Sequence, residues 1–153
     1  MKEESIKNYK IVQIENLNEI KNILYQFNNV FKPTLTERVG NLEIYAEKLY
    51  NNANIFAVIK ELQYIGFAAF YSNDIENNIA YLTQLAVKPE IENKGIGKML
   101  LFASIELSRK MGMKVIKLEV INDNIKAISF YKKNGFKFCQ QVSKNSKYMI
   151  KDL

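Results

Sequence analysis

Alternating and continuous apolar runs predict seven short β-strands along the chain. The runs read KIVQIE, IFAVIK, YIGFAAFY, IAYLTQLAV, KVIKLEVI, FKFCQQV and KYMIKDL, and they occupy residues 10–15, 55–60, 64–71, 79–87, 114–121, 136–142 and 147–153. The polar stretches ELQ and SNDIENN between the second, third and fourth strands are short. Because strands joined by short turns pair antiparallel, we expect an antiparallel meander in the middle of the chain.

Apolar residues at helical spacing predict four helices between these strands. In the first, from Leu17 to Phe31, Asn16 is a suitable N-cap and Pro33 is a stop signal. A second, shorter helix is predicted around residues 42–49. A third is predicted from Gly97 to Met111, with Gly112 as its C-terminal cap.

The fourth helix is predicted after Asp123 or Asn124 and ends at Gly135. The element order is therefore β-α-α-β-β-β-α-β-α-β-β. The strand–helix–strand unit at residues 79–121 predicts a parallel, right-handed crossover. We expect an α/β (α+β) fold with a mixed, mostly antiparallel sheet of about seven strands and helices on both faces.

The length and composition predict a single domain over residues 1–153. The chain is 48% hydrophobic and 25% charged, as is usual for a globular protein. No apolar run approaches the roughly 20 residues that cross a bilayer, and the N-terminus MKEESIKNYK lacks the apolar core of a signal peptide. A cytoplasmic protein without a membrane partner is therefore expected.

Several chemistries are excluded by the residues the chain lacks. It has no histidine, which removes Ser-His-Asp and Cys-His schemes and most zinc sites, and we expect no metal. Its single cysteine, Cys139, cannot form an intrachain disulfide. The net charge is +6, yet all but two of the 22 basic residues are lysines without a dense cluster, and only Arg38 and Arg109 are arginines. We therefore expect no nucleic-acid partner.

The stretch VKPEIENKGIGKMLL at residues 87–101 brings two glycines to the start of a predicted helix. A P-loop is excluded because Glu92 and Met99 stand where it needs glycine and Ser or Thr. A dinucleotide fingerprint is excluded because Leu100 replaces its third glycine. The loop is therefore either an ordinary turn or an anion site.

In the anion-site interpretation, Gly95 can adopt a positive φ and Gly97 lets an anion approach the backbone. The N–H groups of the first helical turn have no internal partners, and together with the helix dipole they form a site of the size of a pyrophosphate. These two glycines alone do not decide between the two interpretations.

A second motif gives the loop an interpretation. Residues 124–136 read NIKAISFYKKNGF, and this segment together with LAVKP at 85–89 and ENKGIG at 92–97 resembles the GNAT N-acetyltransferase superfamily. The resemblance covers residues 53–142 well and the N-terminal third in outline. It departs from the family at Glu92, where the family prefers Arg or Gln.

The resemblance implies that acetyl-CoA binds between the strands 79–87 and 114–121, which are parallel but splay apart. The pantetheine arm would pair with the free strand edge, and the pyrophosphate would lie on the glycine loop. The cofactor-binding residues implied by the resemblance are Leu85, Ala86, Val87, Glu92, Asn93, Lys94, Gly95, Ile96, Gly97, Lys98, Asn124, Tyr131 and Lys133.

The implied reaction moves an acetyl group to a primary amine by direct attack through a tetrahedral intermediate. Tyr131 matches the tyrosine that the family commonly uses as the general acid for the leaving thiolate, although a core aromatic would also fit the position. Glu119 is the candidate base, and a paired or solvated strand residue is the alternative. A catalytically weak acyl-CoA-binding module is the alternative function, because Glu92 departs from the motif.

The acceptor site is expected between the N-terminal helices and the 72–78 turn. Candidate substrate-binding residues are Phe31, Tyr45, Tyr71, Asn73 and Tyr81, although such aromatics are also common in cores. The segment after Phe31 is similar to acetyltransferases found with surface-polysaccharide genes, which suggests an amino sugar or another small amine. A protein amine is a less favoured acceptor. Dimers are common in the family, so a homodimer is an open expectation.

Overall fold

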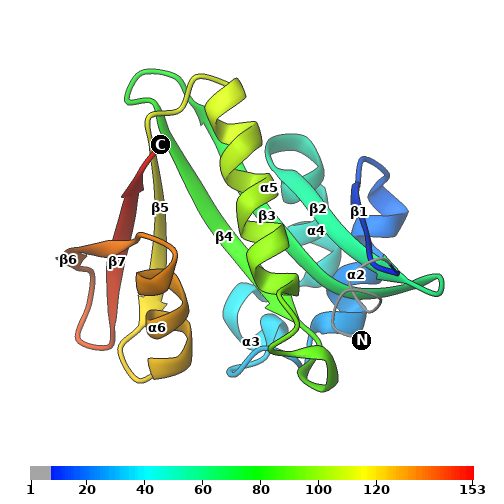
Figure 1. The fold of residues 1–153 in the computed structure, drawn as a ribbon. Helices are drawn as coiled ribbons and strands as arrows, with labels where there is room; N and C mark the ends of the chain where they lie inside the picture. The colour runs from blue at the N-terminus through cyan, green and yellow to red at the C-terminus, as the bar shows by residue number, and fades with distance from the viewer. Residues whose placement is uncertain (1–7) are drawn as a thin grey trace.

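The structure is a computed structural model that describes residues 8–153, which form one seven-stranded sheet with helices on both faces (Figure 1). The strand order is β1-β2-β3-β4-β5-β7-β6. The elements are β1 (Lys10–Gln13), α2 (Leu17–Phe27), α3 (Leu35–Val39), α4 (Leu42–Asn52), β2 (Asn54–Lys60), β3 (Gln63–Asp74), β4 (Ile79–Val87), the 3₁₀ turn η1 (Pro89–Ile91), α5 (Ile96–Lys110), β5 (Val115–Ile121), α6 (Ile125–Lys133), β6 (Lys137–Gln141) and β7 (Ser146–Asp152).

Strands β1 to β4 form the predicted antiparallel meander. Glu61 and Leu62 make the turn between β2 and β3, both with positive φ, as a two-residue hairpin turn of the primed type requires. Strand β3 begins one residue before its predicted start and ends three residues beyond its predicted end, at Asp74, which pairs with Ile79. The Asp74 carboxylate accepts a hydrogen bond from the backbone N–H of Asn77, and this closes the following turn.

Strands β4 and β5 are parallel but stay together over only three residue pairs, from Ile79↔Val115 to Tyr81↔Lys117. Beyond these pairs the two strands diverge, and a wedge opens between them (Figure 1). Strand β7 pairs with β5 and lies between β5 and β6. The predicted mixed sheet with splayed strands at 79–87 and 114–121 is therefore confirmed.

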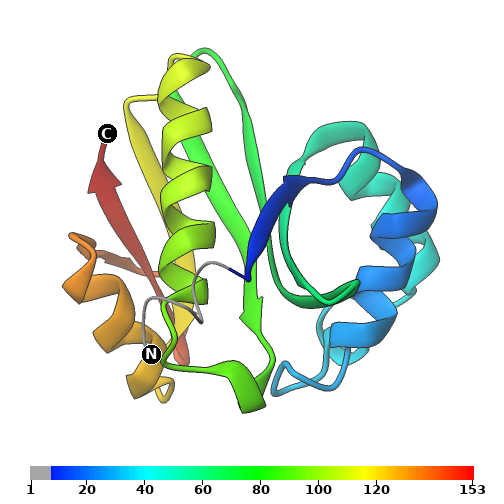
Figure 2. The same cartoon turned by 45° about the vertical axis from the view of Figure 1, so that its right-hand side comes forward.

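Two hydrophobic clusters lie on opposite faces of the sheet. Figure 2 shows helix α5 on one side of the sheet and the N-terminal helices on the other. Helices α2, α3 and α4 bury Phe27, Leu35 and Leu49 against one face. Helix α5 packs on the other face, and α6 adds partly buried residues there. A Cβ at Gly66 in β3 would lie 3.1 Å from the carbonyl oxygen of Ala86 and equally close to two α5 side chains. The glycine therefore allows α5 to pack closely on the sheet.

The segment between the first two predicted helices differs from the prediction. The first helix ends at Phe27, and the short helix α3 follows. A capping box explains its start, because Thr34 accepts from the N–H of Glu37 while the Glu37 carboxylate accepts from the N–H of Thr34. None of the helices within residues 8–153 has both the length and the apolar character that crossing a bilayer requires.

Candidate active site

A cleft of about 1050 Å³ opens where β4 and β5 diverge. Its walls come from the ends of these two strands, the loop before α5, the first turn of α5, helix α6 and the segment around Phe31. Most of the predicted cofactor-binding residues line it: Leu85, Ala86, Val87, Glu92, Asn93, Gly95, Ile96, Gly97, Lys98, Asn124, Tyr131 and Lys133. Lys94 belongs to the same loop but is not part of the lining.

A β-bulge in β4 changes which face its side chains meet. Phe70 pairs with Leu82 and Ala69 pairs with Gln84, so Thr83 is an extra residue in β4. Before the bulge, Leu82 belongs to the cluster under α5. After it, even-numbered residues face the α2–α4 side and odd-numbered residues face the α5 side.

The end of β4 presents free backbone groups to the cleft. The N–H of Lys88 donates to the carbonyl of Ile65, so by the alternation of an antiparallel ladder Ala86 also bonds to β3. The N–H and C=O groups of Leu85 and Val87 therefore point away from β3 and toward the wedge. Because β5 has diverged at this level, they form an open strand edge.

The glycine loop ends in an uncapped helix. Asn93 and Gly95 both have positive φ, at 66° and 81°, and they curl the loop into the start of α5. No side chain caps α5, so the N–H groups of its first turn lack intrahelical acceptors. The N–H of Glu92 is already engaged, because it donates to the carbonyl of Pro89 at 3.3 Å. The free donors of this loop therefore come after Glu92.

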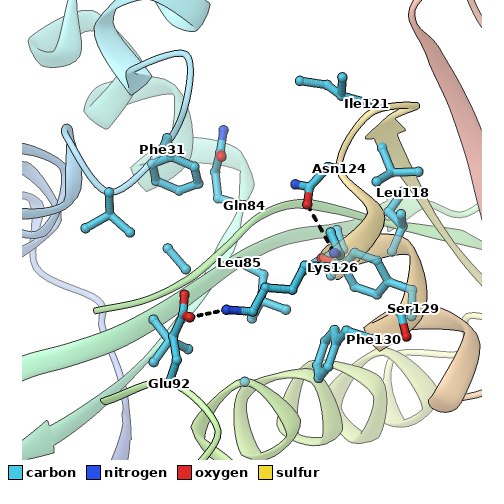
Figure 3. A pocket seen from close by; sticks show the side chains of 18 of the residues that line it. Phe31, Gln84, Leu85, Glu92, Leu118, Ile121, Asn124, Lys126, Ser129 and Phe130 are labelled. Atoms are coloured by element: carbon cyan, nitrogen blue, oxygen red, sulfur yellow. Dashed lines mark hydrogen bonds and ion pairs between the residues drawn. The ribbon is translucent and has the colours of Figure 1, made fainter. Parts of the chain in front are cut away.

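The side chain of Glu92 forms an ion pair with Lys126 of α6 (Figure 3). Both residues line the cleft, and the pair reaches across it from the glycine loop to the first turn of α6. Sequence reasoning did not find Lys126, because 34 positions separate the partners and only the wedge brings them together. The Glu92 carboxylate is therefore held by a cation.

Tyr131 lies on α6 between two aromatic rings. Its ring makes edge-to-face contacts with Phe130 and Phe136, at centroid distances of 5.2 and 5.4 Å. Burial raises the pKa of Tyr131 above its usual value. Burial therefore adds to the preference of this phenol for its protonated form. Asn124 caps the same helix by accepting from the N–H of Ala127 at 3.1 Å.

Glu119 lines the cleft from β5, opposite the glycine loop. Its carboxylate accepts a hydrogen bond of 2.6 Å from the Ser146 hydroxyl of β7. This bond fixes the carboxylate but leaves it further lone pairs. Both the catalytic and the merely paired interpretation of Glu119 are compatible with this contact.

Of the predicted acceptor residues, Phe31 lines the cleft, whereas Tyr45, Tyr71, Asn73 and Tyr81 do not. Tyr45 is buried behind the wall, where its hydroxyl accepts from the Gln84 amide at 2.9 Å. Tyr71 and Tyr81 are cross-strand partners in β3 and β4. Burial, as the main cause, raises the pKa of each of these two phenols to about 12.

Asn73 is bound elsewhere, since its amide donates to the carbonyl of Asn52 at 3.4 Å. Two cations that sequence reasoning did not place here, Lys32 and Arg38, line the cleft beside Phe31. The acceptor site was predicted beside the N-terminal helices, but no pattern indicated which charges of this region would face the cleft. Within residues 8–153, no three His, Cys, Asp or Glu side chains come together as a metal site.

Comparison with known proteins gives a consistent result. Residues 17–136 match the sequence model of the acetyltransferase (GNAT) family. A spermine/spermidine N(1)-acetyltransferase of Bacillus subtilis is 32% identical over 96 residues, which cover 58% of this chain and 63% of the relative. A spermidine N(1)-acetyltransferase of Thermoplasma acidophilum is 43% identical over 60 residues, which cover 39% and 37%. The aligned parts thus span less than two thirds of either relative.

The fold is also similar to that of solved structures. The PaiA N-acetyltransferase from Thermoplasma acidophilum, crystallised in complex with coenzyme A, superposes with a TM-score of 0.73 at 24% identity. The superposition covers 94% of this chain and 99% of that protein. The likeness extends over nearly all of both chains, so it includes the segments that build the cleft.

Proposed function

Because the chain belongs to the acetyltransferase (GNAT) family, we propose that it is an N-acetyltransferase that moves an acetyl group from acetyl-CoA to a small primary amine. The observation that carries this proposal is the wedge between β4 and β5. An open strand edge at Leu85 and Val87 and an uncapped helix start at α5 meet in it. This pair of features suits a ligand that has both amide groups and a pyrophosphate.

The residues of the wedge fit coenzyme A. The backbone edge of Leu85 and Val87 would hold the amides of the pantetheine arm. The N–H groups from Asn93 to Lys98 would hold the pyrophosphate, and Lys126 would add a positive charge once it leaves Glu92. When bound, acetyl-CoA supplies an activated acetyl thioester.

The remaining groups of the site handle protons. Tyr131 holds the proton that the departing thiolate needs, and its aromatic contacts fix the ring in the cleft. Glu119, oriented by Ser146, would accept the proton that the attacking amine loses. A backbone N–H near the end of β4 would donate to the carbonyl oxygen as negative charge develops on it.

The choice of a small amine is supported by the relatives named for spermine and spermidine. A catalytically weak acyl-CoA-binding module is the second candidate, and the Glu92–Lys126 pair across the cleft favours it. Such a module would bind acetyl-CoA but would not transfer its acetyl group to any amine, so no free coenzyme A would form.

Thermal unfolding with and without acetyl-CoA tests the proposal. A ligand at about 100 times its dissociation constant stabilises the native state by about 2.7 kcal/mol, which for a chain of this size raises Tm by roughly 5–10 °C. Thiol release with a panel of amines then separates enzyme from binding module. No shift in Tm at millimolar acetyl-CoA would contradict both functions.

A further inference from the structure

The end of the cleft near Phe31, which we assign to the acceptor, contains an arginine that no acidic side chain of residues 8–153 holds. Arg38 lies on α3 and lines the cleft, with its guanidinium 5.3 Å from the centre of the Phe31 ring. The ion pairs of residues 8–153 join Lys21 to Glu43, Arg109 to Glu106 and Lys126 to Glu92, so none of them uses Arg38.

The environment of Arg38 suits an anion from outside the chain. Its guanidinium is planar and presents five donors in a fork that matches a carboxylate or a phosphate. The Phe31 ring beneath it keeps this plane at the cleft wall. Lys32 is exposed and lines the same end of the cleft, so it adds to the positive charge there.

The wall beside Phe31 also has an unmet hydrogen bond. Gln84 lines the cleft near Phe31 and is only 4% exposed (Figure 3). Its amide nitrogen donates to the Tyr45 hydroxyl, whereas its amide oxygen has no partner within the described chain. A buried amide oxygen without a donor costs stability, so a ligand that donates a hydrogen bond to it, as an amine or hydroxyl group does, is favoured.

The opposite wall carries negative charge. Glu119 lines the cleft from β5. Both charges affect the pKa of the Tyr81 phenol. Burial is the main cause that raises this pKa, Glu119 raises it further, and Arg38 lowers it. A cation and an anion thus lie within electrostatic reach of one phenol, and the acceptor end is bipolar rather than acidic.

We propose that the acceptor is a primary amine that also carries an anionic group, a carboxylate or a phosphate, with the anionic group bound by Arg38 and the amine facing Glu119. The proposal rests on the proposed N-acetyltransferase function and narrows its substrate class. A polyamine would bring a second ammonium group toward Arg38 and Lys32, where like charges repel it. The substrate class therefore differs from that named for the spermine and spermidine relatives.

Steady-state thiol release with acetyl-CoA and matched amines tests the proposal. The panel contains amino acids, an amino sugar phosphate, the corresponding neutral amino sugar, and spermidine. We expect kcat/KM for an anionic amine to exceed that for spermidine by at least about tenfold. The amino acid and amino sugar phosphate arms show whether the anionic group is a carboxylate or a phosphate.

Arg38→Met should lower kcat/KM for the anionic amine by about tenfold to a hundredfold, mainly through KM, because it removes a charge-assisted hydrogen bond. The same variant should lower kcat/KM for the neutral amino sugar much less than for the anionic amine, and Arg38→Lys should restore part of the loss for the anionic amine. Arg109→Met is the matched control and should have no effect, because Arg109 pairs with Glu106 on α5 and does not line the cleft. The rise in Tm with acetyl-CoA should be the same in all of these variants.

Three results would overturn the proposal. If acetyl-CoA raises Tm but spermidine is the better acceptor, or Arg38→Met leaves the anionic amine unaffected, only the substrate class is wrong. If acetyl-CoA causes no shift in Tm, the N-acetyltransferase function fails and the substrate class fails with it.

Discussion

Replacing Glu92 by glutamine should tighten the binding of coenzyme A. The carboxylate of Glu92 holds Lys126 across the cleft, and it stands next to the N–H groups proposed for the pyrophosphate. Glutamine has nearly the same shape but no charge. The substitution therefore releases Lys126 and removes one negative charge from the anion site.

The size of the effect follows from the exposure of the pair. The side chains of Lys126 and Glu92 are 68% and 37% exposed, so solvent screens their attraction and the pair contributes about 0.2–1 kcal/mol. Repulsion between a carboxylate and a phosphate charge at about 5–8 Å in water adds roughly 0.5–0.8 kcal/mol. Together these amount to about 1–2 kcal/mol, so affinity should rise about fivefold to thirtyfold.

Isothermal titration of coenzyme A at about 0.05 and 0.5 M salt measures this effect, and the gain should shrink at high salt because both terms are electrostatic. Glu90→Gln is the matched control, because Glu90 is two positions away, outside the cleft lining. Lys126→Met should weaken binding, and Glu92→Arg should hold or raise affinity. A Glu92→Gln variant that binds no better than Glu90→Gln would refute the reasoning, and a sharp loss in Glu92→Arg would mean that the loop does not bind the pyrophosphate.

Four further outcomes are expected. Tyr131→Phe should lower turnover about a hundredfold or more while the affinity for coenzyme A stays within a factor of two, and unchanged turnover would remove Tyr131 from the acid role. Gly97→Ala should leave Tm nearly unchanged in thermal melts, since its Cβ would lie at an ordinary 3.5 Å from Phe130, but it should weaken coenzyme A binding because the methyl group enters the cleft; equal affinity would contradict this. Gly66→Ala should lower Tm by about 2–12 °C, because the Cβ lies 3.1 Å from three atoms, one of them backbone; a melt at the wild-type temperature would show that α5 can shift. The pKa of Tyr81 in the folded state is raised to about 12, so the stability that the neutral phenol contributes is fully present below pH ~10 and is lost as the pH rises toward 12. Tyr81→Phe should therefore make the fall of Tm between these pH values less steep. A fall as steep as in the wild type would contradict this expectation.

The sheet could largely be predicted from the sequence because its strands have strong local patterns. The strand at 79–87 has the predicted bounds, and the helix predicted from Gly97 begins one residue earlier. Helix α3 was missed because five residues are too few to show a helical period, although the capping box at Thr34 and Glu37 is visible in the sequence. The position of β7 between β5 and β6 depends on long-range pairing, which no local pattern encodes.

The candidate site, like the fold, could be predicted only in part from the sequence. The glycine loop and the α6 residues line one cleft, and motif spacing was sufficient to group them. Their binding roles stay predictions. Tyr45 and Tyr81 were predicted to bind the acceptor but do not line the cleft, because an aromatic residue near a site is as often part of the core as of the site's surface. Arg38 and Lys126 were missed because a charge on an exposed helix has no sequence signal for what it faces.

In the proposed function, strand β4 would separate the donor from the acceptor, and the bulge at Thr83 would decide which of its side chains face each one. Beyond the bulge, odd-numbered side chains of β4 pack on the α5 side and even-numbered ones on the α2–α4 side. Under the proposed function, substitutions at Gln84 would alter acceptor preference while the backbone of Leu85 and Val87 keeps the cofactor edge intact. In a chain with this layout, acceptor specificity can diverge between descendants while the donor stays the same.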